Sequence, residues 1–437
     1  MNYLEHSTEH LNASMPRYFI FIWSAIQLIH LLTFDWWAKE CDVAVRGLMV
    51  LLLLCMVRQN KILTAIAAGA TLVLWFYKMP LIANHILVEW AIAWVVLGAC
   101  LRDVSNPHQK SNISPLITKG LPFIYLLSAF QKMNSGFFDP ASSAAFELFD
   151  WVRYPFRVEV NLDLLPLPYI VVSWELAIGV FLLFMKTRKL GMVLGLFFHF
   201  AMALTQHEGI VSFSFMAACY YLFYLPKDIL SKIEAMLSEK GLRAFMLAPA
   251  AGLAVLLFSP PNIIRVAILT LTLVFLGAWV VLLIWKVSYR DEIRLKHRLD
   301  WILPILFAIN ALQPHIGGKT ALAFDMFSNL RTEPGYANHL ILQPVYWFDY
   351  QTRIAEITSS NIAPLGPPLI DPQKGKPAMI VEYGLFQYIE RRMWSEYPNV
   401  IYTVGEEEFS LRGVPDLNYF EKKFVAFDLI PALPKGD

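Results

Sequence analysis

Charged side chains are scarce in this sequence. Asp, Glu, Lys and Arg make up 16% of the 437 residues, against about 25% in an average soluble protein. The net charge is +1 and no block of basic residues occurs, which argues against a nucleic-acid partner. Hydrophobic residues reach 57%, so the composition predicts a protein whose main partner is a lipid bilayer.

Cysteine is also rare, and its four residues are scattered along the chain. They show no CxxC spacing, so we interpret them as small hydrophobic side chains and expect neither disulfides nor a metal site. Gly-rich phosphate loops and nucleophile elbows are likewise missing from the sequence. The first apolar run is followed by Phe34-Asp35-Trp36-Trp37 instead of small residues, which predicts a retained anchor and not a cleaved signal peptide.

Long apolar runs recur along the chain, and a helix needs about 20 such residues to cross a bilayer. The sequence therefore predicts an all-α polytopic membrane protein with about eleven transmembrane helices. A cytoplasmic N-terminus (1–16) would precede a transmembrane domain (17–330). The candidate spans are 17–34, 43–57, 62–78, 84–101, 114–131, 168–185, 189–206, 209–226, 243–259, 262–286 and 299–314.

Lys and Arg in the connections predict the orientation, because cytoplasmic loops carry an excess of both. One set of alternate connections holds about 17 of them and the other set about 7, and this bias places the N-terminus in the cytoplasm. An odd number of spans then places the C-terminus outside. The richer connections are those around 58–61, 102–119, 186–189, 227–243 and 286–298.

The composition changes in the last part of the chain, which contains several prolines between 364 and 377. Strand-like runs at 378–383, 400–404 and 424–430, with helical periodicity at 385–397, predict a small extracytoplasmic α+β domain over 331–437. No catalytic motif is recognisable in it.

Ionisable residues within membrane spans are costly, so each is a candidate for function. His85 opens the fourth predicted span and Glu89 follows one turn later, at a spacing that lets a carboxylate orient an imidazole. The alternative is an interfacial histidine beside a glutamate that reaches toward the headgroups.

Lys132 ends the fifth predicted span, followed closely by Asn134. This lysine either extends to the interface or is desolvated in the helix bundle, where it could act as a base. Glu175 lies about two turns from the outer end of its span, too deep for easy solvation. We expect this carboxyl to be paired, protonated or lining a wet cavity.

His199 lies in the middle of the seventh predicted span, with Gln206 on the same helix face. This polar stripe suits a cavity that opens outward, or His199 makes a single interhelical hydrogen bond. The candidates His85, Lys132 and Glu175 all fall toward the outer face, which favours a shared outward-facing cavity.

The run from Leu121 to Phe137, which ends in Ser-Ala-Phe-Gln-Lys132-Met-Asn-Ser-Gly-Phe137, is similar to the segment of vitamin K-dependent gamma-glutamyl carboxylases that carries their catalytic lysine. Further resemblance lies in Trp174-Glu-Leu-Ala-Ile-Gly, in Phe197-Phe-His199-Phe and in Asp325-Met-Phe-Ser328. Asn84-His85 resembles the start of the helix with the family's active-site histidine. The broader group is the HTTM (horizontally transferred transmembrane) domain family, and the resemblance covers roughly residues 15–330 in order.

This resemblance implies an integral-membrane enzyme that uses a reduced quinone, vitamin K-like or menaquinol, and carboxylates or deprotonates a peptide or small substrate on the outer side. Lys132 would be the general base toward the quinol and His85 its orienting partner. Glu89, Asn134, Glu175, His199 and Gln206 would support or line the cavity. The chain departs from the animal carboxylases in its shorter length and in a tail unlike their large β-rich domain.

Two alternatives stay open. Some HTTM proteins resemble the sporulation-delaying protein B type, which implies a non-enzymatic membrane partner in peptide maturation or export. A transporter would normally show two related halves with discontinuous helices, and no such symmetry is evident. The resemblance places the chain in a bacterial plasma membrane.

Overall fold

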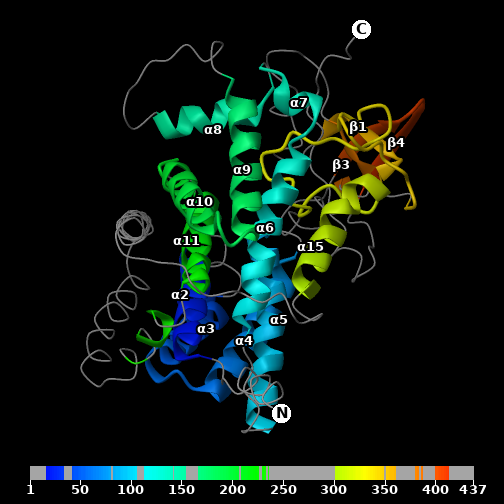
Figure 1. Ribbon diagram of the computed structural model, residues 1–437. Helices are drawn as coiled ribbons and strands as arrows, with labels where there is room; N and C mark the ends of the chain where they lie inside the picture. The colour runs from blue at the N-terminus through cyan, green and yellow to red at the C-terminus, as the bar shows by residue number, and fades with distance from the viewer. Residues whose placement is uncertain are drawn as a thin grey trace, which may run out of the picture. The chain divides into compact units, whose positions relative to one another are not determined.

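The computed structural model of the chain is mostly helical, with a few strands near the C-terminus (Figure 1). It describes residues 16–33, 42–79, 82–105, 113–140, 142–153, 166–205, 208–225, 229–232, 235, 301–348, 351–360, 379–382, 385–386 and 399–412. The chain divides into two compact units. The first comprises 1–77, 85–129 and 145–307, and the second comprises 78–84, 130–144 and 308–437.

Each predicted span that lies in the described residues coincides with a helix, to within a few residues at either end. These helices are α2 (Arg17–Thr33), α3 (Asp42–Arg58), α4 (Lys61–Lys78), α5 (Asn84–Ser105), α6 (Ser114–Gln131), α9 (Leu167–Leu183), α10 (Arg188–Ala203), α11 (Glu208–Tyr221) and α15 (Ile302–Leu312). Short 3-10 helices, η5 (Leu222–Tyr224) and η7 (Gln313–Ile316), extend α11 and α15. The predicted spans 243–259 and 262–286 lie outside the described residues.

Two helices of the described part, α4 and α5, are long and apolar enough to cross a membrane. The apolar helices α2, α9, α11 with η5, and α15 with η7 are shorter. The helical character of the runs is thus confirmed, whereas the number of eleven spans stays a prediction.

Local signals set the helix boundaries in the first unit. Gln59 has a left-handed φ of 50° at the end of α3. The side chain of the next residue, Asn60, accepts the backbone N–H groups of Ile62 and Leu63 (2.8 and 3.2 Å) and so caps α4. Lys61 at the start of α4 pairs with Asp103 near the end of α5 (3.0 Å), which indicates that the two helices run antiparallel.

Five helices of the first unit pack successively against one another, in the order α3, α2, α11, α10 and α9 (Figure 1). Trp174 of α9 stacks on Phe197 of α10 at 5.9 Å, and its indole N–H donates to the carbonyl of Leu194. A Cβ on Gly191 would lie 2.8 Å from the backbone nitrogen of Leu182. A small residue is therefore required where α9 and α10 cross, as is common in membrane helix pairs.

The sequence predicts no membrane span between 132 and 167. The described part of this region contains the helices α7 (Ser135–Phe138) and α8 (Ala144–Arg153). The α8 sequence mixes three charged residues with aromatic and aliphatic ones. It is therefore amphipathic, and a search for uninterrupted apolar runs passes over it.

A four-stranded antiparallel sheet lies in the second unit, in the order β2-β1-β3-β4. The strands are β1 (Ile354–Ser360), β2 (Met379–Val381), β3 (Asn399–Val404) and β4 (Glu407–Arg412). Strands β2 and β3 confirm two of the predicted strands, while the predicted strand 424–430 and most of the predicted helix 385–397 lie outside the described residues. The sheet's small core contains Ala355, Ile357, Leu385, Val400 and Tyr402.

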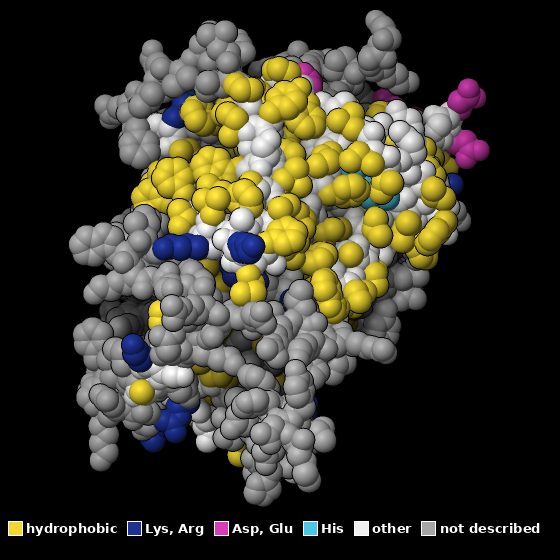
Figure 2. Space-filling model, viewed as in Figure 1, with side chains coloured by type: hydrophobic (Ala, Val, Ile, Leu, Met, Phe, Trp, Pro, Cys, Tyr) yellow, Lys and Arg dark blue, Asp and Glu magenta, His cyan; other side chains and the backbone are white. Residues whose placement is uncertain are grey.

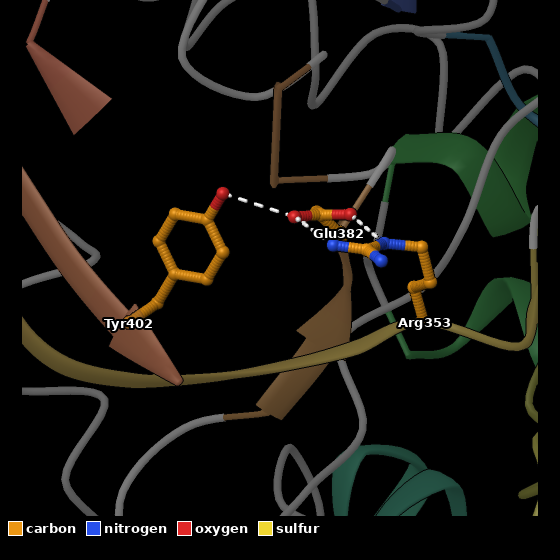
Figure 3. Close-up of polar contacts among 3 residues, drawn as sticks. All are labelled: Arg353, Glu382 and Tyr402. Atoms are coloured by element: carbon orange, nitrogen blue, oxygen red, sulfur yellow. Dashed lines mark hydrogen bonds and ion pairs between the residues drawn. The ribbon is translucent and has the colours of Figure 1, made fainter. Parts of the chain in front are cut away.

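A polar contact joins three parts of this sheet domain (Figure 3). Arg353, directly before β1, pairs with Glu382, directly after β2. The hydroxyl of Tyr402 on β3 donates to the same carboxylate at 3.0 Å. Burial, together with this bond to Glu382, raises the pKa of Tyr402 above its usual range, so its phenol stays protonated as a donor.

Candidate functional site

A pair of buried histidines lies in the first unit, one on α2 and one on α5. The rings of His30 and His85 are 5.1 Å apart, and His85 is only 2% exposed. Nε2 of His85 is 2.9 Å from Oγ of Ser212 on α11. Because the Ser212 hydroxyl donates to the Gly209 carbonyl, its oxygen accepts the Nε2 proton of His85. A neutral His85 therefore carries its lone pair on Nδ1.

The buried His30 has polar atoms without a hydrogen-bond partner. Among the described residues, both of its ring nitrogens lack one, as do Nε1 of Trp23 and Oγ of Ser24 on α2 and Oγ1 of Thr71 on α4. Buried polar groups normally find partners, so the His30 ring could bind a polar ligand or water.

Glu89 is fully buried. The spacing on α5 predicted that Glu89 orients His85, but it does not. Within the described part of the chain, its carboxylate accepts hydrogen bonds from Gln27 of α2 and from the hydroxyl of Tyr220 on α11. Gln27 in turn accepts the indole N–H of Trp75 at 3.2 Å. The predicted carboxylate–imidazole pair is therefore replaced by an interhelical network through Gln27 and Tyr220. Its members lie too far apart in the sequence for local spacing to reveal them.

His199 on α10 makes two interhelical contacts. Its Nε2 lies 2.5 Å from the hydroxyl of Tyr125 on α6, and its Nδ1 lies 3.2 Å from Oγ of Ser214 on α11. The Tyr125 hydroxyl is also 2.5 Å from that of Tyr221. Both ring nitrogens of His199 are hydrogen-bonded. This histidine therefore fits a structural role in holding helices together better than a role as a reactive group.

One aromatic ring lies between these two histidine sites. Phe213 of α11 contacts His85 at 5.6 Å and His199 at 4.9 Å, measured between ring centroids. Its neighbours Ser212 and Ser214 bond to His85 and His199 respectively. Helix α11 therefore positions both imidazoles.

Glu175 of α9 is buried, and one of its carboxylate oxygens accepts a weak hydrogen bond from Ser128 of α6 at 3.4 Å. The structure thus agrees with the expectation that this carboxyl is too deep for easy solvation. Gln206, the remaining member of the predicted polar stripe, lies outside the described residues.

Lys132 and Asn134 belong to the second unit, whereas His85, Glu89, Glu175 and His199 belong to the first. Lys132 is 3% exposed, so its side chain is buried. Asn134 has a structural role as the cap of α7, because its Oδ1 accepts the N–H of Phe137 at 2.8 Å. Its amide donates to the carbonyls of Gln131 and Ser328 (2.8 and 2.6 Å) and fixes the turn that follows Lys132.

A second histidine pair lies in this unit. The rings of His315 and His339 are 4.8 Å apart. Nε2 of His315 donates to Gln131 (3.1 Å), and Nε2 of His339 donates to the carbonyl of Phe130 (3.0 Å). The backbone N–H groups of Ile341 and Leu342 donate to Nδ1 of His339, and burial lowers the pKa of this ring, so it is neutral.

Sequence reasoning overlooked His30 and the second histidine pair. His30 could have been found by the rule applied to His85, because it too lies within an apolar span. His315 and His339 lie beyond the predicted spans, so no such signal marked them. Within the described residues, no cluster of His, Cys, Asp and Glu could hold a metal ion.

Comparisons with known proteins add no family assignment. No family model matches the chain, and no curated protein or solved structure shows significant similarity to it.

Proposed function

We propose that the chain is an integral-membrane protein whose helices face lipid with their apolar sides. The observation that supports this is the number of large hydrophobic side chains exposed on the helices (Figure 2). Val73 is 71% exposed, and others lie on most of the apolar helices: Val43, Ile66, Trp94, Tyr169, Phe197 and Ile305. Soluble monomers rarely expose contiguous apolar patches larger than a few hundred Å² (about 300–600 Å²).

Polar groups show the opposite distribution in the same helices. Gln27, Glu89, His30, His85 and His199 are buried while the apolar residues above are exposed. Bilayer-embedded proteins favour this arrangement, because ionisable groups within spans face the helix bundle and mark sites of function. The N-terminus would lie in the cytoplasm and the sheet domain outside, in a bacterial plasma membrane.

We infer further that the protein is an enzyme of the vitamin K-dependent carboxylase-like type that uses a membrane quinol. A quinol, when bound, would supply a strong base through its oxidation by molecular oxygen. The buried His30, whose two ring nitrogens have no hydrogen-bond partner and whose ring lies 5.1 Å from that of His85, supports a ligand with polar oxygens. The two residues that the resemblance assigns, Lys132 and His85, are both buried, as desolvated catalytic groups are.

The roles of these two residues follow from their chemistry. Lys132 would act as the general base toward a quinol hydroxyl. His85, held by Ser212 through Nε2, would offer Nδ1 as a hydrogen-bond acceptor to a ligand hydroxyl. The surrounding apolar helices would exclude water from the reactive species.

The proposed enzymatic function is tested by purifying the protein in nanodiscs and identifying the lipids that it retains by mass spectrometry. The wild type should hold stoichiometric quinone that Lys132→Ala and His85→Ala lose or reduce severalfold. Matched controls are Lys319→Ala in the second unit and Lys119→Ala in the first, two buried lysines that the resemblance does not assign to the site.

Both controls should retain quinone. If neither the wild type nor any variant contains more quinone than the bulk lipid does, the proposed enzymatic function is wrong. It would favour a non-enzymatic role in peptide maturation or export.

A further inference from the structure

An exposed apolar loop follows His339 in the second unit. Residues 340–348 read Leu-Ile-Leu-Gln-Pro-Val-Tyr-Trp-Phe and contain no charged side chain. Trp347 is 72% exposed and Leu340 62%. Ile341, Val345 and Phe348 are also exposed. Such a surface requires a partner, because water solvates it poorly.

The loop has a well-bonded backbone in spite of its irregular path. The N–H of Leu340 donates to the carbonyl of Met133 (2.9 Å), and those of Ile341 and Leu342 donate to His339. The N–H groups of Val345 and Trp347 donate to the carbonyls of His315 and Ile316 (2.7 and 3.1 Å). Irregular backbone can enter a water-poor region only when its polar groups are satisfied by the protein, and five backbone N–H groups of this loop meet that condition.

The hydrogen bonds of Val345 and Trp347 fix the loop to η7, which continues directly from α15. Ile309 and Leu312, in the last turns of α15, expose their side chains as well. Figure 2 shows hydrophobic side chains gathered at the surface over α15. The loop therefore extends an apolar surface that begins on the last predicted span.

The loop also places its aromatic groups as an interfacial segment does. Trp347 and Phe348 are exposed, whereas the Tyr346 hydroxyl donates to the carbonyl of Thr332 at 2.7 Å. Tryptophan is enriched where hydrocarbon meets headgroups. From the missing charge, the hydrogen-bonded backbone N–H groups and the continuity with α15, we propose that loop 340–348 inserts into the outer membrane–water interface, with lipid as its partner. This inference rests on the proposed membrane embedding.

Nitroxide labels on single cysteines in nanodiscs, with oxygen and a nickel chelate as relaxing agents, test this insertion. Only Cys41→Ser is needed as background, because Cys55, Cys100 and Cys219 are buried. The label positions are Trp347→Cys, Val73→Cys on the exposed face of α4 and Glu408→Cys on the exposed hairpin of β3 and β4. We expect severalfold greater collision with oxygen than with nickel at 347 and 73, and the reverse at 408.

The outcomes separate the two proposals. If 73 reports lipid while 347 behaves like 408, the loop faces water and the insertion is wrong. If 347 is shielded from both agents, a protein segment covers it and lipid is not its partner. If 73 also reports water, the membrane embedding itself fails.

Discussion

At the scale of single residues, Gly195 on α10 is a position where the packing leaves no room for a methyl group. A Cβ there would lie 1.9 Å from the hydroxyl of Tyr221, which contacts Tyr125 and through it His199. Gly195→Ala must displace Tyr221, and we expect a loss of about 1–3 kcal/mol, as for other overpacked interiors. Thermal unfolding in detergent measures it.

Gly69→Ala on α4 is the matched control, since no atom lies within 4 Å of its added Cβ. An open helical site should gain about 0.5–1 kcal/mol from this change. Equal effects of the two substitutions would show that the close contact between Gly195 and Tyr221 is wrong.

The buried side chain of Lys319 makes the stability of the folded protein depend on pH. Burial lowers its pKa to about 8, partly opposed by Asp325, while the unfolded value is about 10.4. Between these values the unfolded chain binds more protons than the folded one, so stability rises with pH across this window. The gain should amount to about 1–3 kcal/mol.

Unfolding midpoints of the wild type and Lys319→Met, compared from pH 7.5 to pH 10, isolate this group. The wild type should gain stability relative to the variant as pH rises. A constant difference between the two proteins would mean that Lys319 keeps an ordinary pKa in the folded state.

At this scale the sequence identified individual side chains but not their partners. His85, Glu89, Glu175, His199 and Lys132 were found because each interrupts an apolar run, and all are buried. The partners of Glu89 are 62 and 131 positions away. Such pairs depend on how helices pack, and one sequence without relatives does not contain that information.

At the scale of secondary structure, the contact between Arg353 and Glu382 connects β2 to the rest of the sheet. Glu382→Gln removes the ion pair but leaves an acceptor for Tyr402 (Figure 3). Arg353 is 54% exposed at its side chain, so water screens the pair and its loss should cost about 1 kcal/mol or less. Amide exchange at Ile380 and Val381 should accelerate several-fold.

Tyr402→Phe provides the comparison for this change, because it deletes the hydrogen bond from the Tyr402 hydroxyl to Glu382 and keeps the ion pair. If β2 exchanges at the wild-type rate in Glu382→Gln, the ion pair does not stabilise this strand.

Helices were predicted more accurately than strands for a physical reason. A helix in an apolar run is specified by its own residues, so boundaries such as those of α2 and α6 could be placed from the sequence. Strands β1 and β4 were missed because their sequences are mixed in polarity. Glu407 and Glu408 even open β4, which forms only through its pairing with β3.

At the scale of the whole molecule, the account depends on where the apolar surface lies. Side chains such as Val73 and Trp347 are exposed while His30, Glu89 and His199 are buried. This distribution supports the proposed placement of the helices in a bilayer. The candidate site, the orientation and the interfacial loop all depend on this placement.

Extraction of the full-length protein from membranes is the most direct test of this claim. After expression in bacteria, membranes are washed with alkaline carbonate and then treated with a mild detergent. The account predicts that the protein stays in the washed membrane pellet and is released only by detergent. Recovery as a monodisperse protein in detergent-free buffer would contradict it.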